Sequence, residues 1–197
     1  MNAVPDLSKA DPRWFQILTL GGLLTYAIGV LAFDQTVANF AVLAATALLT
    51  QHICGRLSGR GRLADLLSAL ITALSLSLLL RTSGIGIYVL AAILAVASKF
   101  VIRIDGKHIF NPANFAIVAL IMLTGEAWVS PGQWGREVIL VFAFSALAAL
   151  VLTRAKRLDV ALTFLAVYAG LVLARAVSLG DPLAIPAQQL QSGALLL

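Results

Sequence analysis

The stretch Lys107–Phe115, KHIFNPANF, combines a lysine, a histidine, two asparagines and a proline inside a largely apolar chain. Asparagine is a preferred N-cap residue, and proline is tolerated at the first position of a helix because its missing N–H has no intrahelical partner there. Asn111 and Pro112 therefore predict a helix that begins abruptly. Asn114 falls in its first turn, and Gly106 permits a close turn before it.

Two interpretations of this cluster fit the residues. The helix runs for about 13 residues to Thr124, roughly 20 Å, which is shorter than the ~30 Å apolar core of a bilayer. Its start could lie below the membrane surface as a half-helix, where free N–H groups bind an anionic or polar group. Alternatively, it is an ordinary capped helix at the interface, with Lys107 and His108 among the lipid headgroups.

The composition indicates an integral membrane protein. Of the 197 residues, 60% are hydrophobic and 12% are charged, whereas soluble domains are about 45–50% apolar and about 25% charged. A spanning segment must satisfy its own backbone hydrogen bonds, so we expect an all-α, polytopic fold. The net charge of +5 fits basic membrane loops, and we expect a lipid bilayer as partner and no nucleic acid.

The apolar runs predict about seven spans, which would position the polar cluster between the fourth and the fifth. Residues 1–13 form a cytoplasmic N-terminal segment, and residues 14–197 form a single transmembrane domain. Residues 192–197 look like the start of an eighth segment, and we expect the natural chain to continue. The predicted spans are 14–33, 37–54, 63–80, 84–100, 109–124, 138–153 and 158–178.

The basic residues predict the orientation of these spans, since cytoplasmic loops are enriched in lysine and arginine. Counting loops on alternate sides gives 11 basic residues on one side and 3 on the other. This asymmetry favours seven crossings with a cytoplasmic N-terminus. The larger group is Lys9, Arg13, Arg56, Arg60, Arg62, Lys99, Arg103, Lys107, Arg154, Lys156 and Arg157, and the smaller is Arg81, Arg136 and Arg175.

Other reactive residue types offer little chemistry. One cysteine, Cys54, makes no internal disulfide, and His52 and His108 are too few for a metal site. Asp65 and Asp159 fall in predicted first turns, where a carboxylate complements the helix dipole. No carboxylate lies in the middle of a predicted span, which argues against a carboxylate-driven pump.

The stretch GKHIFNPANFAIVAL, Gly106–Leu120, resembles the signature of the NqrB/RnfD family. These proteins are membrane subunits of the sodium-pumping NADH:quinone oxidoreductase and of the Rnf ferredoxin:NAD oxidoreductase complex. Asn111-Pro112-Ala113 matches the Asn-Pro-Ala of the family pattern, and His108 stands where its first asparagine would be. Short RnfD-like proteins from enediyne biosynthesis clusters look closer, because they also contain HIFNPANF.

The resemblance implies an inverted-repeat architecture with broken helices, similar to that of urea transporters. Ser192-Gly193-Ala194 resembles a later family segment that opens the second half of the repeat. In such a fold the helix at Asn111 and the segment at Ser192 would enter the membrane from opposite faces.

The resemblance also suggests cofactors. Redox members of the family carry FMN on a threonine in the loop after the Asn-Pro-Ala helix, but no such motif occurs in residues 125–136. We therefore expect no covalent FMN and propose a noncovalent flavin (riboflavin or FMN) or a quinone. We predict no catalytic or metal-binding residues. The candidate cofactor-binding residues are Lys107, His108, Asn111, Pro112, Asn114, Ser192 and Gly193.

Two functions remain open at this stage. One is a non-catalytic membrane subunit of an Rnf- or Nqr-like oxidoreductase (translocase) complex in the inner (plasma) membrane. It would move electrons by flavin or quinone, with ion coupling as an option, beside other membrane subunits and a flavoprotein or FMN-bearing partner. The other is a transporter or channel-like protein for a small polar solute on the same scaffold. A scaffold subunit that only docks partners is a third option.

Overall fold

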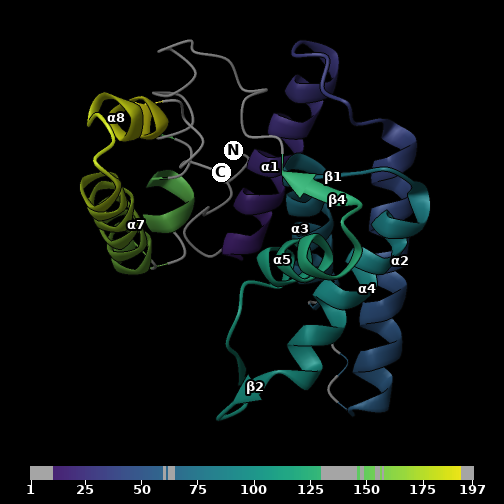
Figure 1. The fold of residues 1–197 in the computed structure, drawn as a ribbon. Coiled ribbons are helices and arrows are strands. Elements are labelled where there is room, and N and C mark those ends of the chain that lie inside the picture. The colour runs from purple at the N-terminus through teal and green to yellow at the C-terminus, as the bar shows by residue number, and fades with distance from the viewer. Residues whose placement is uncertain are drawn as a thin grey trace, which may run out of the picture. The chain divides into compact units, whose positions relative to one another are not determined.

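The computed structural model describes residues 11–59, 61, 65–129, 146, 149–153, 156 and 158–191. The chain divides into two compact units, Met1–Ser130 and Pro131–Leu197. The described residues are mostly helical, as the composition predicted (Figure 1).

Five helices of the first unit lie where the first five apolar runs were predicted, with boundaries that differ by a few residues. The last of them, the short helix predicted after Asn111, begins at Pro112 and ends at Thr124. The helices are α1 (Pro12–Gly29), α2 (Val37–Leu57), α3 (Asp65–Leu79), α4 (Ile85–Val101) and α5 (Pro112–Thr124).

Small residues allow these helices to pack closely. Helix α4 packs against α2 and α5, and α3 packs against α1 and α2. Ala91, Ala92 and Ala95 of α4 are fully buried, and Leu43 of α2 lies in the same core cluster. Short side chains let helix backbones approach one another, which is the usual way that apolar helices associate in lipid.

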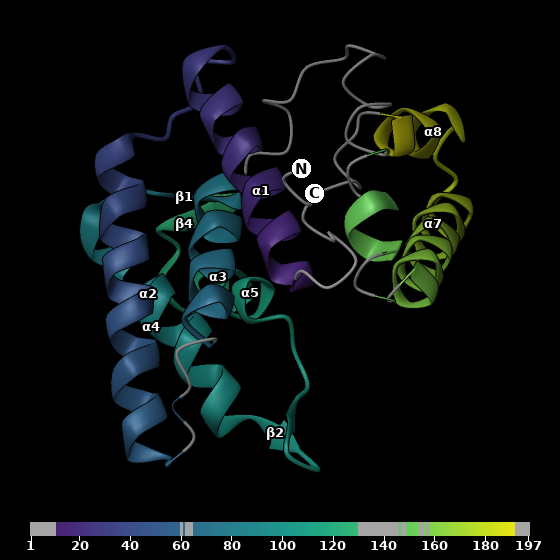
Figure 2. The same cartoon turned by 180° about the vertical axis from the view of Figure 1, so that it is seen from behind.

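The structure corrects the prediction that helices are the only elements. Two short antiparallel pairs lie at opposite ends of the first unit (Figures 1 and 2). Strand β1 (Leu80–Thr82) pairs with β4 (Ala127–Val129), and β2 (Arg103–Ile104) pairs with β3 (Lys107–His108). All four segments lie at or near helix ends, where backbone groups have no intrahelical partners and pair with each other instead.

The orientation count treated Arg81 as a loop residue, but its side chain is buried in the structure. It lies in β1, only 3% exposed, and its guanidinium stands 5.2 Å from the centre of the Phe33 ring. Its Nη1 donates to the backbone oxygens of Ser77 and Leu80 at 3.0 and 2.8 Å. The side chain therefore binds backbone oxygens at the end of α3 and does not face solvent.

The second unit contains helix α7 (Leu158–Leu179), at the position of the seventh predicted span, and helix α8 (Ala184–Gln191), which was not predicted. The two helices pack against each other. Most of the predicted span 138–153 and all of residues 192–197 lie outside the described residues. The expectations for Ser192 and Gly193 therefore stay predictions.

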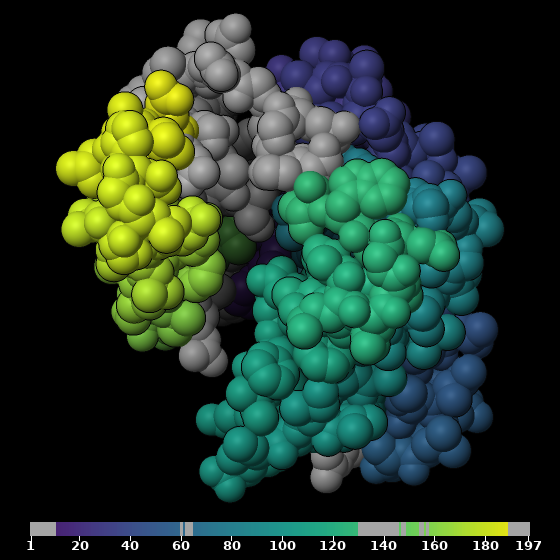
Figure 3. All heavy atoms as spheres, in the orientation of Figure 1, coloured from purple at the N-terminus to yellow at the C-terminus, as the bar shows by residue number. Residues whose placement is uncertain are grey.

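Two of the described helices, α2 and α7, are long and apolar enough to cross a membrane, while α3, α4 and α5 are apolar but shorter. Residues of α5 and β4 cover much of the near face of the first unit in Figure 3. On this helix Met122 and Leu123 are each 79% exposed. Such exposed apolar side chains suit contact with lipid.

Candidate functional site

The predicted N-cap is confirmed at the start of α5. Oδ1 of Asn111 accepts hydrogen bonds from the backbone N–H groups of Ala113 and Asn114, at 3.0 and 3.3 Å. Pro112 occupies the first helical position. The side-chain oxygen of Asn111, a candidate cofactor-binding residue, is thus engaged in capping the start of the helix.

Aromatic packing fixes the direction from which the chain enters α5. Phe110 precedes the cap, and Phe115 lies four residues beyond it; their ring centres are 5.8 Å apart. This arrangement corresponds to a hydrophobic staple, which sets the entry angle of a helix. The polar stretch therefore forms a rigid helix start, and its chemistry depends on which side chains point inward.

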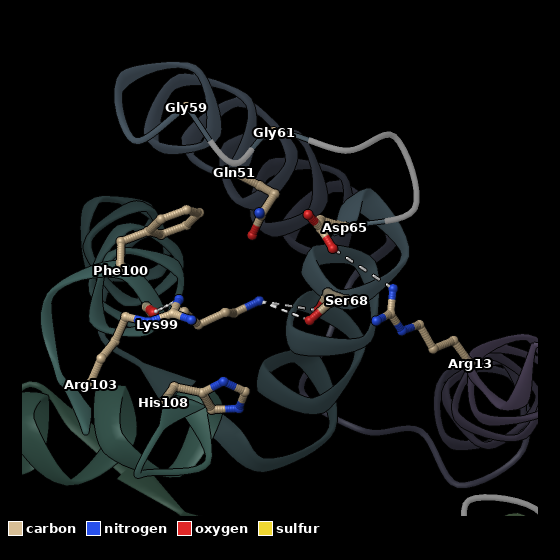
Figure 4. Close-up of a pocket in the computed structure, with 10 residues that line it drawn as sticks. All are labelled: Arg13, Gln51, Gly59, Gly61, Asp65, Ser68, Lys99, Phe100, Arg103 and His108. Carbon is tan, nitrogen blue, oxygen red and sulfur yellow. Dashed lines mark hydrogen bonds and ion pairs between the residues drawn. The ribbon is translucent and has the colours of Figure 1, made fainter. Parts of the chain in front are cut away.

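A polar cavity of about 510 Å³ lies at the end of the first unit that holds the β2–β3 hairpin. Its lining comes from α1, α2, α3, α4, the hairpin and the connection after α2 (Figure 4). Three side chains in the lining are basic and one is acidic. The lining residues are Arg13, Gln51, Gly59, Gly61, Asp65, Ser68, Lys99, Phe100, Arg103 and His108.

Lys99 is the most deeply buried charge in this cavity, at 7% exposed. Its Nζ donates to the backbone oxygen of Ser68 at 3.3 Å and to the Ser68 hydroxyl at 3.2 Å. An ammonium group has three donors, so one remains without an acceptor among the described residues. Burying such a charge is costly unless an opposite charge compensates it.

The β2–β3 hairpin brings Arg103 and His108 opposite each other, in register. Its two-residue turn is Asp105-Gly106, and both residues have positive φ, +50° and +76°. A type I′ hairpin turn requires this conformation, and Asp-Gly adopts it readily. The turn anticipated at Gly106 is therefore what returns His108 to the cavity.

Arg103 is anchored by its own backbone surroundings. Its Nη1 donates to the backbone oxygen of Lys99 at 3.0 Å, and its Nη2 donates to the backbone oxygen of Gly106. Its Nε is buried and has no hydrogen-bond partner in the described part of the chain. The guanidinium is thus held in place by two hydrogen bonds, and its Nε is left without an acceptor among these residues.

Gln51 and an ion pair complete the polar lining. Gln51 is 7% exposed, and its Oε1 is buried without a hydrogen-bond partner in the part of the chain that the structure describes. Arg13 on α1 lies 4.0 Å from Asp65 on α3. Figure 4 shows Gln51, Asp65, Lys99 and His108 around one space. Among the described lining residues, basic side chains thus outnumber carboxylates.

Backbone contact between two glycines forms one wall. A Cβ added to Gly55 would lie 3.0 Å from the Cα of Gly61, which is tighter than nine in ten real Cβ contacts. Gly55 is in α2, and Gly61 is in the connection that lines the cavity. Only glycine at both positions lets the connection pass this close to the helix.

The positive surroundings act on His108. Partial burial lowers the pKa of its imidazole below the ordinary value, and the charges of Lys99 and Arg103 lower it further. The neutral imidazole is therefore favoured near neutral pH. A bound anion would counteract the two cations and favour the protonated form.

The structure does not bring the predicted site residues together in one site. Of the five that lie in the described part of the chain, only His108 lines the cavity; Lys107, Asn111 and Asn114 are exposed, and Pro112 is half-buried at the helix start. Ser192 and Gly193 lie outside the described residues.

Sequence reasoning missed Gln51, Ser68, Lys99 and Arg103, because it treated basic residues as orientation signals only. A signal for two of them exists in the sequence. Lys99 and Gln51 are polar residues within runs that are otherwise apolar, and intramembrane polar residues are often functional.

A second, apolar cavity of about 530 Å³ lies between α1, α2 and α3. Its lining includes Leu24, Phe40, Leu70 and Leu74. Among the described lining residues, Thr25 alone has a side chain that can form hydrogen bonds, so this cavity suits an apolar ring or a hydrocarbon chain.

Comparison with known proteins gives no relative. No protein-family model, no curated protein and no solved structure matches the chain. The site must therefore be judged on its own geometry: a polar, positively charged cavity that is lined by His108, a residue of the strand that precedes α5.

Proposed function

We propose that this chain is a multi-pass membrane subunit of an electron-transport complex of the NqrB/RnfD type. It would hold a noncovalent flavin or a quinone near α5 and pass electrons to and from partner subunits. The observation that carries the proposal is the HIFNPANF stretch, which forms a short capped helix whose inner face packs on α4. His108 from the same stretch lines the polar cavity.

The proposed topology has seven crossings in the inner membrane with the N-terminus in the cytoplasm. Helix ends that the charge count assigned to the cytoplasm, at Arg13, Gly59 and Lys99, line one cavity. The connections assigned to the opposite side meet in the β1–β4 pair. This separation of helix ends supports the alternation of the first five spans, because antiparallel neighbours must turn at opposite faces.

The apolar cavity, whose described lining includes no residue of α5, offers a second place in the first unit for an apolar part of the cofactor. Flavin and quinone both present a planar ring, and a quinone adds a hydrocarbon tail. An apolar volume of about 530 Å³ between α1, α2 and α3 is within the usual range for a small-molecule pocket. The protein would supply position and electrostatics, and the bound group would supply the redox chemistry.

The test is to purify the full-length protein in mild detergent with its co-purifying partners. We expect flavin absorbance or an extractable quinone, and partner subunits that reduce or oxidise it. A preparation with neither cofactor and no redox-active partner would rule out the proposal. Uptake of a small polar solute by liposomes containing the same preparation would then favour the transporter alternative.

A further inference from the structure

We propose that the polar cavity lined by Lys99, Arg103, His108 and Gln51 is a binding site for a phosphate group. The inference goes beyond electron transport, since the site requires no redox cofactor. Two kinds of molecule could supply the phosphate group: a soluble organic phosphate, or an anionic lipid through its headgroup.

Charge is the first argument. Among the described residues, the lining holds three basic side chains, those of Arg13, Lys99 and Arg103, and one carboxylate, that of Asp65. Asp65 is partly engaged by Arg13 at 4.0 Å. Neither Lys99 nor Arg103 forms an ion pair within the described residues. A phosphate monoester carries about −1.5 to −2 charges near neutral pH, which would balance this excess.

Unused hydrogen-bonding capacity is the second argument. Lys99 donates only to Ser68, and Nε of Arg103 is buried without an acceptor in the described part of the chain. Buried polar groups are normally paired, and an orphan of this kind needs a partner such as a ligand. Phosphate oxygens accept from both ammonium and guanidinium groups, with shorter and stronger bonds than neutral acceptors make.

Size is the third argument. About 510 Å³ is far more than inorganic phosphate occupies, and it lies within the range of pockets that hold small organic molecules. Phe100 supplies an apolar surface in the same lining, while the Gln51 amide offers a neutral polar contact. The phosphate would therefore belong to a larger molecule or to a lipid headgroup that reaches in from the interface.

The experiment uses the full-length protein in nanodiscs of phosphatidylcholine, whose headgroup has no net charge. Binding of inorganic phosphate is measured by equilibrium dialysis at low salt, because screening weakens such contacts. We expect saturable binding that Lys99→Met weakens by roughly tenfold to a hundredfold, the effect of losing one charged hydrogen-bond donor. Arg103→Gln provides the same test if Lys99→Met does not fold.

Lys107→Met is the matched control. Lys107 lies next to His108 in β3 and is a lysine like Lys99. However, it is exposed and does not line the cavity. Its substitution should leave phosphate binding unchanged.

A parallel arm tests the lipid source. Protein from phosphatidylglycerol nanodiscs is analysed by native mass spectrometry. If inorganic phosphate does not bind but phosphatidylglycerol is retained, and Lys99→Met loses it while Lys107→Met keeps it, the phosphate belongs to a lipid. If neither ligand binds, or if both variants lose binding equally, the proposal is wrong.

Discussion

The ammonium group of Lys99 on α4 lies against Ser68 on α3, donating to its backbone oxygen at 3.3 Å and to its hydroxyl at 3.2 Å. The two residues are 31 positions apart in the sequence. This contact ties a charge near the end of one helix to the first turns of another. It also holds that charge in the cavity, where an anion could meet it.

Removing the Ser68 hydroxyl should destabilise the protein. In Ser68→Ala the buried ammonium loses one of its two acceptors, and we expect the free energy of unfolding to fall by about 1–3 kcal/mol. Denaturation in mixed micelles measures this. Ser178→Ala is the control, because that hydroxyl is exposed and donates within its own helix; a change within ~0.5 kcal/mol is expected there.

The same pair can be tested by a double-mutant cycle. Lys99→Met removes the buried charge, so Ser68→Ala should cost much less in that background. Equal costs in the two backgrounds would show that the Lys99–Ser68 contact does not contribute to stability.

The Asn111 cap gives a second prediction. Asn111→Ala should lower the free energy of unfolding by ~1 kcal/mol, because two backbone N–H groups lose their acceptor. Asn111→Asp keeps an acceptor and should cost little. Asn114→Ala is the control, since Asn114 contributes a backbone donor only. If Asn111→Asp is stable yet loses flavin or quinone, Asn111 also acts in binding.

Gly55 gives a third prediction. Gly55→Ala should displace the connection at Gly61, because the new methyl group would lie 3.0 Å from its Cα. We expect weaker phosphate binding and a lower melting temperature. Gly22→Ala has open space at the new methyl position and should be neutral or stabilising, as alanine favours helix. Equal melting temperatures for the two variants would contradict the close packing at Gly55.

The pKa of His108 predicts a pH dependence of anion binding. Sulfate is the suitable probe, since its charge is constant over the range used. Burial and the charges of Lys99 and Arg103 lower the pKa of His108. Protonation of His108 should therefore strengthen anion binding, and a bound anion should in turn favour the protonated imidazole. Arg13 and Asp65 also line the cavity.

The affinity for sulfate should therefore rise as the pH falls from about 7 to about 5. His108→Gln should abolish most of that rise, because it removes the imidazole that gains a proton in this range. Equilibrium dialysis across the pH range measures it. A rise of the same size in the variant would mean that another group is responsible.

The proposed topology predicts the side from which two positions react. In a Cys54→Ser background, Ser83→Cys should be labelled by an impermeant maleimide on intact cells. Lys107→Cys should react only after the membrane is opened. Both positions are exposed, so access depends on the side of the membrane. Labelling of both from outside would contradict the alternation of spans.

The sequence was enough to predict the helices of the first unit and the start of α5. Apolar runs predict helices because burial in lipid forces the backbone to pair within one segment. Asn111 and Pro112 predict a helix start because the cap and the missing N–H act over a few residues only. The turn at Gly106 is local in the same way.

Only the tertiary structure decided which polar residues meet. Lys99, Ser68, Gln51 and Arg103 come from different elements, and the helix packing that joins them depends on side chains distant in sequence. The β1–β4 pair likewise joins segments more than 40 residues apart. A charge count can assign Lys99 to one side, but burial and its contact with Ser68 turn that charge into part of a cavity.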